Sequence, residues 1–214
     1  MDVIEKQINY RVTNTYNTLN QLTDKTKNIW IVFHGIGYLG RYFLKYFDQL
    51  NADENYIIAP QAASKYYLNN EYRHVGASWL TKENTQEEVK NIYSYLDAVI
   101  ASENLPPNID LIVFGYSQGV SVASRWVVHN KPVCKKLVLY AGVVPNELTP
   151  TDFEFLISGG TEVTFIVGDQ DEYLTEVRRT AESQRIKTLF QAAAKEIVFE
   201  GRHEVKKEFI NSLT

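Results

Sequence analysis

The stretch FGYSQG, Phe114–Gly119, decides how the rest of the chain is interpreted. It follows an apolar run typical of a strand, precedes a run with helical spacing, and carries the pattern G-x-S-x-G. Where that pattern joins a strand to a helix, the backbone turns so tightly that the serine is held at the apex with its hydroxyl exposed. Gly115 and Gly119 have no side chain, so the strand and the helix can approach closely. The pattern therefore predicts an exposed, nucleophilic Ser117.

Apolar strands and helices alternate on both sides of this turn. The runs at 28–33, 56–59, 109–114, 136–140, 163–167 and 197–199 are largely apolar, as are strands of a parallel sheet that is covered on both faces. Helical spacing of apolar residues follows most of them. We therefore predict an α/β fold with a mostly parallel central sheet and helices on both faces. Only residues 141–162 separate two of these strands, so any lid is small or absent.

Four further segments have weaker patterns. Loose alternation of apolar and polar residues over 7–19 indicates an edge strand. Apolar residues between positions 39 and 50 recur at helical spacing and predict one helix there. Thr85 and Glu88 have the spacing of a capping box and predict the start of a long helix. Residues 60–79 are rich in aromatic side chains without a clear period, and we expect a loop.

Length and composition are those of one globular domain. The 214 residues fit a single α/β domain, which we expect to span residues 1–214. The formal net charge of −4 provides no electrostatic reason to expect nucleic acid or an anionic membrane surface as a partner. Residues 1–20 contain no apolar run of signal-peptide length, and no segment reaches the ~18 apolar residues of a transmembrane helix. We therefore expect no stable membrane association.

A single cysteine, Cys134, limits both redox and metal chemistry. One cysteine cannot form an internal disulfide, and it leaves no C-x-x-C pair for a metal ion. The cytoplasm is therefore the expected compartment, and Cys134 is interpreted as structural.

A serine hydroxyl attacks carbonyl groups only if a neighbouring base takes its proton, and that base is most often a histidine. In an open parallel sheet the reactive groups gather at the carboxyl ends of the strands. This favours His203, which follows the last strand, and leaves His34, which follows the first apolar strand, as the second candidate. His129 is too distant, because twelve helical residues place it about 18 Å from Ser117.

The carboxylate that orients the histidine is expected in the loop after the strand at 163–167. Asp169, Asp171 and Glu172 compete for this role. A serine followed by an acid and then by a histidine is the order found in α/β-hydrolases.

Two backbone N–H groups are needed to bind the negative charge that develops on the carbonyl oxygen. One is expected from Gln118, the residue after the nucleophile, and the other from the loop His34–Gly37, where Ile36 is the predicted donor. In the aromatic segment, Trp79 is a candidate substrate contact, because apolar aromatic walls commonly surround such ligands. The alternative is that Trp79 belongs to the core.

Taken together, these motifs resemble those of the phospholipase/carboxylesterase family of α/β-hydrolases, which includes the acyl-protein thioesterases. The matching segments are HGIG at 34–37 with Gly40, PQA at 60–62, SW at 78–79, GYSQG at 115–119, GDQD at 168–171 and EGRH at 200–203. The family's G-x-x-D pattern selects Asp171 over Asp169, and its closing histidine segment supports His203. Val120 stands where the family usually has a second glycine, and Glu172 replaces a proline.

The resemblance implies a serine hydrolase that cleaves a small-molecule carboxylic ester or thioester through an acyl-enzyme, with Ser117, Asp171 and His203 as a triad and without a cofactor or metal. Two alternatives stay open. A hydrolase of the same fold could act on another bond, such as a lactone or a peptide. A ligand-binding member could keep the pocket and lack turnover.

Overall fold

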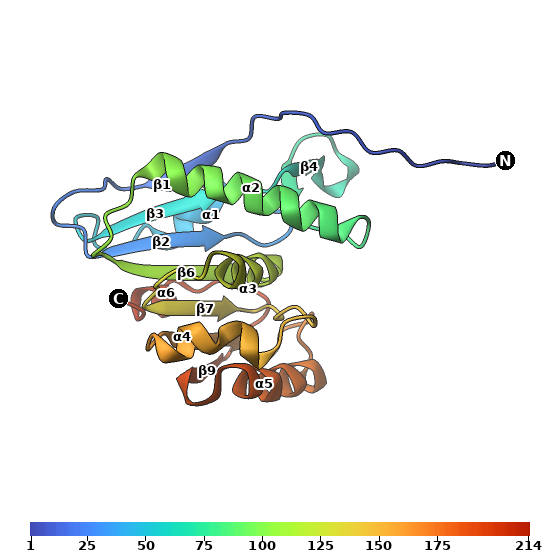
Figure 1. Ribbon diagram of the computed structural model, residues 1–214. Coiled ribbons are helices and arrows are strands. Elements are labelled where there is room, and N and C mark those ends of the chain that lie inside the picture. Colours follow the sequence, from blue (N-terminus) through green and yellow to red (C-terminus); the bar gives the residue numbers. More distant parts are fainter.

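A seven-stranded sheet forms the centre of the molecule, and a two-stranded hairpin accompanies it (Figure 1). The structure is a computed structural model that describes residues 1–69 and 71–214 in full and, at Asn70, the backbone alone. The strands are β1 (Tyr16–Leu19), β2 (Asn28–Phe33), β3 (Asn55–Pro60), β4 (Ser64–Tyr67), β5 (Val75–Ser78), β6 (Asp110–Tyr116), β7 (Lys136–Tyr140), β8 (Glu162–Gly168) and β9 (Ala194–Phe199). The α-helices are α1 (Gly40–Phe43), α2 (Thr85–Glu103), α3 (Gln118–Asn130), α4 (Glu154–Ser158), α5 (Glu176–Phe190) and α6 (Lys207–Asn211). The 3₁₀-helices are η1 (Leu44–Phe47), η2 (Leu68–Asn70), η3 (Pro150–Phe153) and η4 (Gln191–Ala193).

The order of the strands explains where a site can form. The sheet runs β1-β3-β2-β6-β7-β8-β9, and every neighbouring pair is parallel except β1 with β3. From β2 the next strand, β3, is added on one side, and β6 to β9 are added on the other side. Such a switch point in the strand order opens a crevice at the carboxyl ends of the strands. Phe33 at the end of β2 is paired with Gly115 in β6, so the loops that follow these strands begin side by side.

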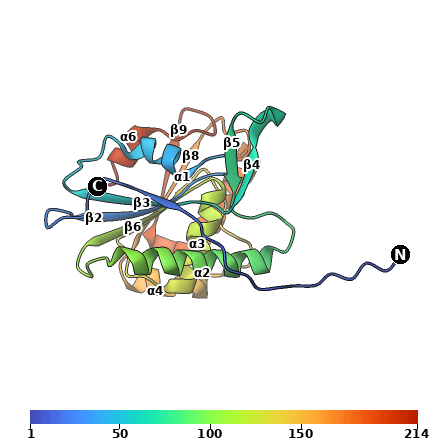
Figure 2. The same cartoon turned by 90° about the horizontal axis from the view of Figure 1, so that it is seen from above.

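Helices cover both faces of the sheet, which confirms the predicted fold class. Helices α2, α3, α4 and α5 lie on one face, and α1 and α6 lie on the other (Figure 2). Strand β2 is buried throughout because alternate side chains point to opposite faces. Ile31 and Phe33 enter the core on the side of α3, whereas Trp30 and Val32 enter the core on the side of α1. None of the helices in the described part of the chain combines the length and the apolar composition needed to span a membrane.

The predicted edge strand over residues 7–19 is much shorter in the structure. Only β1 pairs, and its first residue, Tyr16, lies opposite Pro60, the last residue of β3. The residues before Tyr16 therefore have no strand beside them in the sheet. Ile8 and Tyr10 are 86% and 80% exposed, so their alternation does not reflect a buried face.

The aromatic segment predicted as a loop contains the β4–β5 hairpin instead. Tyr66 lies opposite Gly76, and Tyr67 lies opposite Val75. The side chains of β4 are all exposed, and this explains why the sequence has no burial period there. Strand β5 has three buried residues, Gly76, Ala77 and Ser78, so burial accompanies the pairing only on that side of the hairpin.

The long helix expected from Thr85 onward is present as α2, but two details of the predicted helices differ. The single helix expected between positions 39 and 50 is divided into α1 and η1. The capping box at Thr85 does not form, because Thr85 is already the first helical residue and its hydroxyl donates to the carbonyl of Thr81 at 2.8 Å. Asn84 occupies the cap position with φ 49°.

Candidate active site

Ser117 occupies the sharp turn between β6 and α3. Its backbone has φ 54° and ψ −119°, a region that residues with side chains rarely adopt. A Cβ at Gly119 would lie 2.1 Å from the carbonyl oxygen of Phe33, and one at Gly115 would lie 2.5 Å from that of Gly119. Both glycines therefore have the role that the G-x-S-x-G pattern predicts. The turn leaves the Ser117 side chain partly exposed at the carboxyl edge of the sheet.

His203 reaches Ser117 from the loop after β9. Its Nε2 lies 2.9 Å from the Ser117 Oγ. Two tyrosines fix the loop and the ring: the Tyr116 hydroxyl donates to the His203 carbonyl at 2.9 Å, and the Tyr173 ring meets the imidazole edge to face at 4.7 Å. The structure thus brings together the serine and the histidine that are 86 residues apart in the chain.

Asp171 completes the row of hydrogen-bonded side chains. Its Oδ2 lies 2.7 Å from the His203 Nδ1, and its side chain is fully buried. The other oxygen, Oδ1, accepts the backbone N–H groups of Tyr173 and Leu174, both at 2.8 Å. A carboxylate held in this way orients Nδ1–H toward itself and leaves Nε2 free to accept the serine proton.

The competing acid, Asp169, lies elsewhere in the same loop. It is exposed, and its Oδ1 accepts the N–H of Gly201 at 3.0 Å. Asp169 therefore joins the loop after β8 to the loop after β9, while Asp171 contacts the imidazole.

The loop after β2 lies against the serine turn, as expected for a second oxyanion donor. A Cβ at Gly35 would lie 3.1 Å from the Ser117 Cβ. The N–H of Gly37 is used by the hairpin, since it donates to Ala77 at 2.8 Å. The N–H of Ile36 makes no hydrogen bond within the described part of the chain. Gln118 is the first residue of α3, so its N–H has no acceptor inside the helix.

Trp79 is not at the surface beside Ser117. It is 2% exposed, and its indole N–H donates to the carbonyl of His34 at 2.9 Å. This position matches the core alternative, and the role of Trp79 as a substrate contact stays a prediction. Trp79 braces the loop that begins at His34.

The side chain of Gln118 has a bracing role that the sequence did not reveal. Its Oε1 accepts the N–H of Trp79 at 2.8 Å, and its Nε2 donates to the carbonyl of Leu80 at 2.6 Å. A Cβ at Gly76 would lie 2.6 Å from the carbonyl oxygen of Gly37, so the hairpin also packs tightly on the loop after β2. One segment, β5 with Trp79 and Leu80, thus contacts Gln118 and also Gly37, the residue after Ile36.

His34 is wholly buried and hydrogen-bonded at both ring nitrogens. Nε2 accepts the N–H of Ala62 at 3.2 Å, and Nδ1 donates to the carbonyl of Gly35 at 2.8 Å. Burial lowers the pKa of His34 to about 4 from its ordinary 6.5. The imidazole is therefore neutral near pH 7 and shapes the loop.

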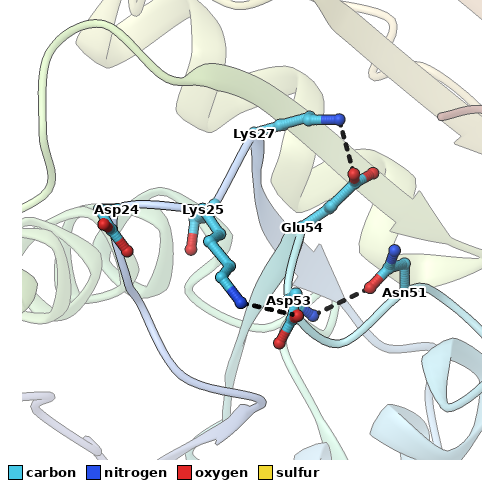
Figure 3. Close-up of a pocket in the computed structure, with 7 residues that line it drawn as sticks. Asp24, Lys25, Lys27, Asn51, Asp53 and Glu54 are labelled. Carbon is cyan, nitrogen blue, oxygen red and sulfur yellow. Dashed lines mark hydrogen bonds and ion pairs between the residues drawn. The ribbon is translucent and has the colours of Figure 1, made fainter.

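A hollow of about 380 Å³ lies at the opposite end of the sheet (Figure 3). It is lined by Asp24, Lys25, Thr26, Lys27, Asn51, Asp53 and Glu54, which precede β2 and β3. Four of its charged side chains form ion pairs, Lys25 with Asp53 at 3.4 Å and Lys27 with Glu54 at 2.6 Å. It contains none of the residues around Ser117.

Comparison with known proteins agrees with this architecture. The structure resembles an acyl-protein thioesterase 2 of Zea mays, with a TM-score of 0.68 and 14% identity over 94% of this chain and 96% of that one. It also resembles a phospholipase/carboxylesterase of Dyadobacter fermentans, with a TM-score of 0.68 and 20% identity over 95% and 97% of the chains. A carboxylesterase of Bacillus cereus has a TM-score of 0.64 and 17% identity over 94% and 91%.

These identities are low, so the three structures establish the fold alone. No curated protein matches the chain by sequence. The model of one family, described as phospholipase/carboxylesterase, matches residues 14–214. The match covers nearly the whole chain and includes all the segments around Ser117. The chain therefore belongs to the phospholipase/carboxylesterase family of α/β-hydrolases.

Proposed function

We propose that this protein is a serine hydrolase that cleaves carboxylic esters or thioesters through an acyl-enzyme on Ser117. Membership of the family supports an esterase or thioesterase type of enzyme. The observation that carries the finer proposal is the continuous row from Ser117 Oγ to His203 at 2.9 Å and from His203 to Asp171 at 2.7 Å. A nucleophile, a base and an orienting acid are the three groups that acyl transfer to serine requires.

The first half of the proposed reaction forms the acyl-enzyme. His203 Nε2 takes the proton of Ser117 as Oγ attacks the carbonyl carbon, and the carbonyl oxygen becomes an oxyanion. The N–H groups of Ile36 and Gln118 bind that charge, and the amino end of α3 adds a favourable dipole. His203 then gives its proton to the departing alcohol or thiol, and the acyl group remains on Ser117.

The second half repeats the same steps with water. His203 removes a proton from water, the hydroxide attacks the acyl carbon, and the oxyanion forms again between the same two N–H groups. The Ser117 oxygen leaves with the proton that His203 carries, and the carboxylic acid is released. Asp171 keeps its negative charge throughout and stabilises the imidazolium.

We propose a small-molecule substrate and a single catalytic domain over residues 1–214.

Replacing the nucleophile tests the proposal directly. We expect Ser117→Ala to lower kcat/KM for p-nitrophenyl butyrate by about 10⁴-fold or more, as is usual when a triad serine is removed. Ser124→Ala is the matched control: it lies on the same helix, and its buried hydroxyl has no partner in the described part of the chain, so activity is expected to be unchanged.

A fluorophosphonate probe separates turnover from binding. Labelling of the wild-type protein, and its loss in Ser117→Ala, is the expected result. Full hydrolysis by a pure Ser117→Ala sample would refute the mechanism. A wild-type protein that binds ester analogues but is never labelled would indicate a ligand-binding member, and labelling without ester hydrolysis would indicate a hydrolase of another bond.

A further inference from the structure

The loop of residues 143–148, which follows β7, starts directly beside the nucleophile. Strand β7 lies between β6, which carries Ser117, and β8, which precedes Asp171. The N–H of Ser117 donates to the carbonyl of Tyr140 at 2.8 Å. A Cβ at Gly142 would lie 2.3 Å from the carbonyl oxygen of Ser117. The chain therefore enters this loop in contact with the serine turn.

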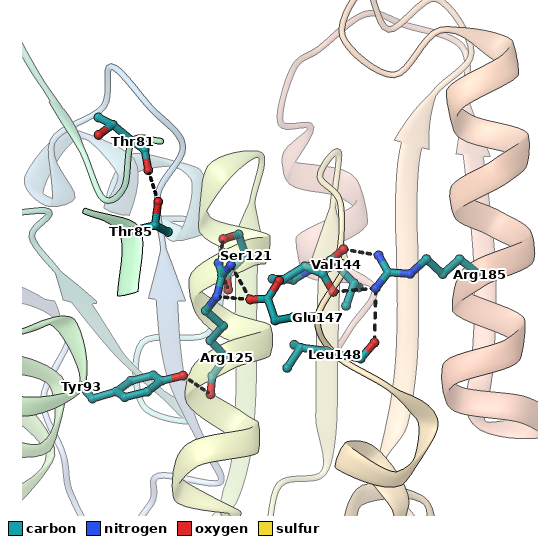
Figure 4. A network of polar contacts seen from close by, with 10 residues as sticks. Thr81, Thr85, Tyr93, Ser121, Arg125, Val144, Glu147, Leu148 and Arg185 are labelled. Atoms are coloured by element: carbon teal, nitrogen blue, oxygen red, sulfur yellow. Dashed lines mark hydrogen bonds and ion pairs between the residues drawn. The ribbon is translucent and has the colours of Figure 1, made fainter. Parts of the chain in front are cut away.

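Helix α5 holds the loop through the charged side chains of Glu182 and Arg185, and Figure 4 shows the contacts of Arg185. Glu182 is buried, and its Oε1 accepts the N–H of Val144 at 2.8 Å. The guanidinium of Arg185 donates to the carbonyls of Val144, Pro145 and Leu148, the last two at 2.5 and 3.3 Å. Loop carbonyls have no strand partner, and the rigid fork of an arginine can satisfy several of them at once.

Helix α3 holds the same loop from the other side. The Arg125 guanidinium lies 2.6 Å from Glu147 and also donates to the hydroxyl of Ser121 (Figure 4). The side chain of Glu147 is 58% exposed, and an exposed ion pair contributes little. The contacts from α5 are less accessible to water, because Glu182 is buried and Arg185 is partly buried. The contacts from α5 therefore hold the loop more strongly than the ion pair from α3 does.

We propose that Arg185 and Glu182 are positioning residues that hold the 143–148 loop as a fixed wall beside Ser117, and that this wall limits the size of the acyl group that the site accepts. The inference rests on the proposed function and adds a determinant of its substrate class, short acyl esters. A loop tied to α5 through four backbone groups cannot retreat to admit a longer chain. Without the ties it can move away from the serine turn.

The test compares two esters on the same preparation of enzyme. We expect Arg185→Met to raise the ratio of kcat/KM for p-nitrophenyl octanoate to that for the acetate by about fivefold or more, because freeing a pocket wall relaxes discrimination by chain length. The ratio does not depend on the fraction of folded enzyme, so a loss of stability alone does not change it. Arg185→Lys keeps the charge but loses the fork, and a smaller change in the same direction is expected.

Lys187→Met is the matched control, since it removes one exposed positive charge from the same helix without touching the loop. Its ratio is expected to stay within about twofold of the wild type. Hydrogen exchange of the peptide over 143–148 should become faster in the Arg185 variants only. A ratio in both Arg185 variants that stays within about twofold, or a shift toward acetate, overturns the inference. If Arg185→Met does not fold, Arg185→Lys and Glu182→Met decide the outcome, because methionine has no oxygen to accept the Val144 N–H.

Failure of the proposed function is a different result. In that case the wild-type protein shows no Ser117-dependent hydrolysis of either ester. If the wild-type enzyme and its variants hydrolyse the esters and the ratio of kcat/KM values is unchanged, the inference about the loop is overturned and the proposed function is not.

Discussion

A polar residue flanks strand β2 at each end, and the two residues differ in burial. At the amino end, Lys27 pairs with Glu54 at 2.6 Å, and their side chains are 66% and 37% exposed. At the carboxyl end, His34 is completely buried, and both of its ring nitrogens are hydrogen-bonded within the protein. The hollow of about 380 Å³ belongs to the first end, and the row of Ser117, His203 and Asp171 belongs to the second.

The difference shows that a hollow by itself is a weak sign of function. Exposed charges that pair in water are mobile and screened, so they cannot hold a reacting group in a defined place. Buried groups with fixed partners can, because each hydrogen bond removes a degree of freedom and water does not compete. Parallel strands also direct their carboxyl ends and the following helix N-termini to one edge, where negative charge is favoured.

The largest effect is expected when the buried acid of the loop after β8, Asp171, is replaced and the loss of activity is compared with that for the exposed acid, Asp169. Asp171→Asn should lower kcat/KM for p-nitrophenyl butyrate by about 10³–10⁴-fold, because an amide favours the wrong tautomer of the histidine. Asp169→Asn keeps an oxygen that can accept the Gly201 N–H, and a loss of no more than about threefold is expected. Equal losses in the two variants would contradict the assignment of Asp171.

The buried His34 at the carboxyl end of β2 should make the free energy of unfolding depend on pH. His34 has a folded pKa lowered by burial to about 4 from 6.5, so between these values the unfolded chain binds more protons than the folded one. The stabilising effect of the neutral imidazole is complete above pH 6.5 and is lost as the pH falls toward 4, by about 3 kcal/mol in total. Urea unfolding at several pH values measures this change.

The control for that prediction is His34→Gln, which has no group that titrates in this range. Its free energy of unfolding should fall less than that of the wild type between pH 6.5 and 4. If the two proteins lose the same amount, His34 is not the source of the dependence.

The smallest effect is expected at the amino end. Replacing Lys27 by Gln and Glu54 by Gln should change the free energy of unfolding by no more than about 0.5–1 kcal/mol, since exposed ion pairs contribute little. Hydrolysis of p-nitrophenyl butyrate should not change. A tenfold loss of activity, on the order of 1.4 kcal/mol in the activation barrier, would contradict the claim that only the carboxyl end of β2 contributes to the reaction.

Local patterns predicted much of the fold. The strands at 28–33 and 136–140 have the bounds of β2 and β7, because a strand buried on both faces needs an uninterrupted apolar run. The turn at Ser117 was also predictable, since its glycines are required by contacts within a few residues of the serine and with the adjacent strand. Segments with little burial were predicted poorly, as the exposed β4 and the unpaired residues before β1 show.

Sequence by itself therefore determined the family, the α/β architecture and the candidates Ser117, Asp171 and His203, because these depend on apolar runs and short motifs. Only the tertiary structure decided that Asp169 contacts Gly201 and not His203, that Trp79 is buried against the carbonyl of His34, and that α5 contacts the loop after β7. These depend on contacts between residues far apart in the chain, such as Val144 with Arg185, 41 positions apart, and Trp79 with His34, 45 positions apart. No local pattern encodes such a contact, since it forms only when the sheet has brought separate loops to one edge.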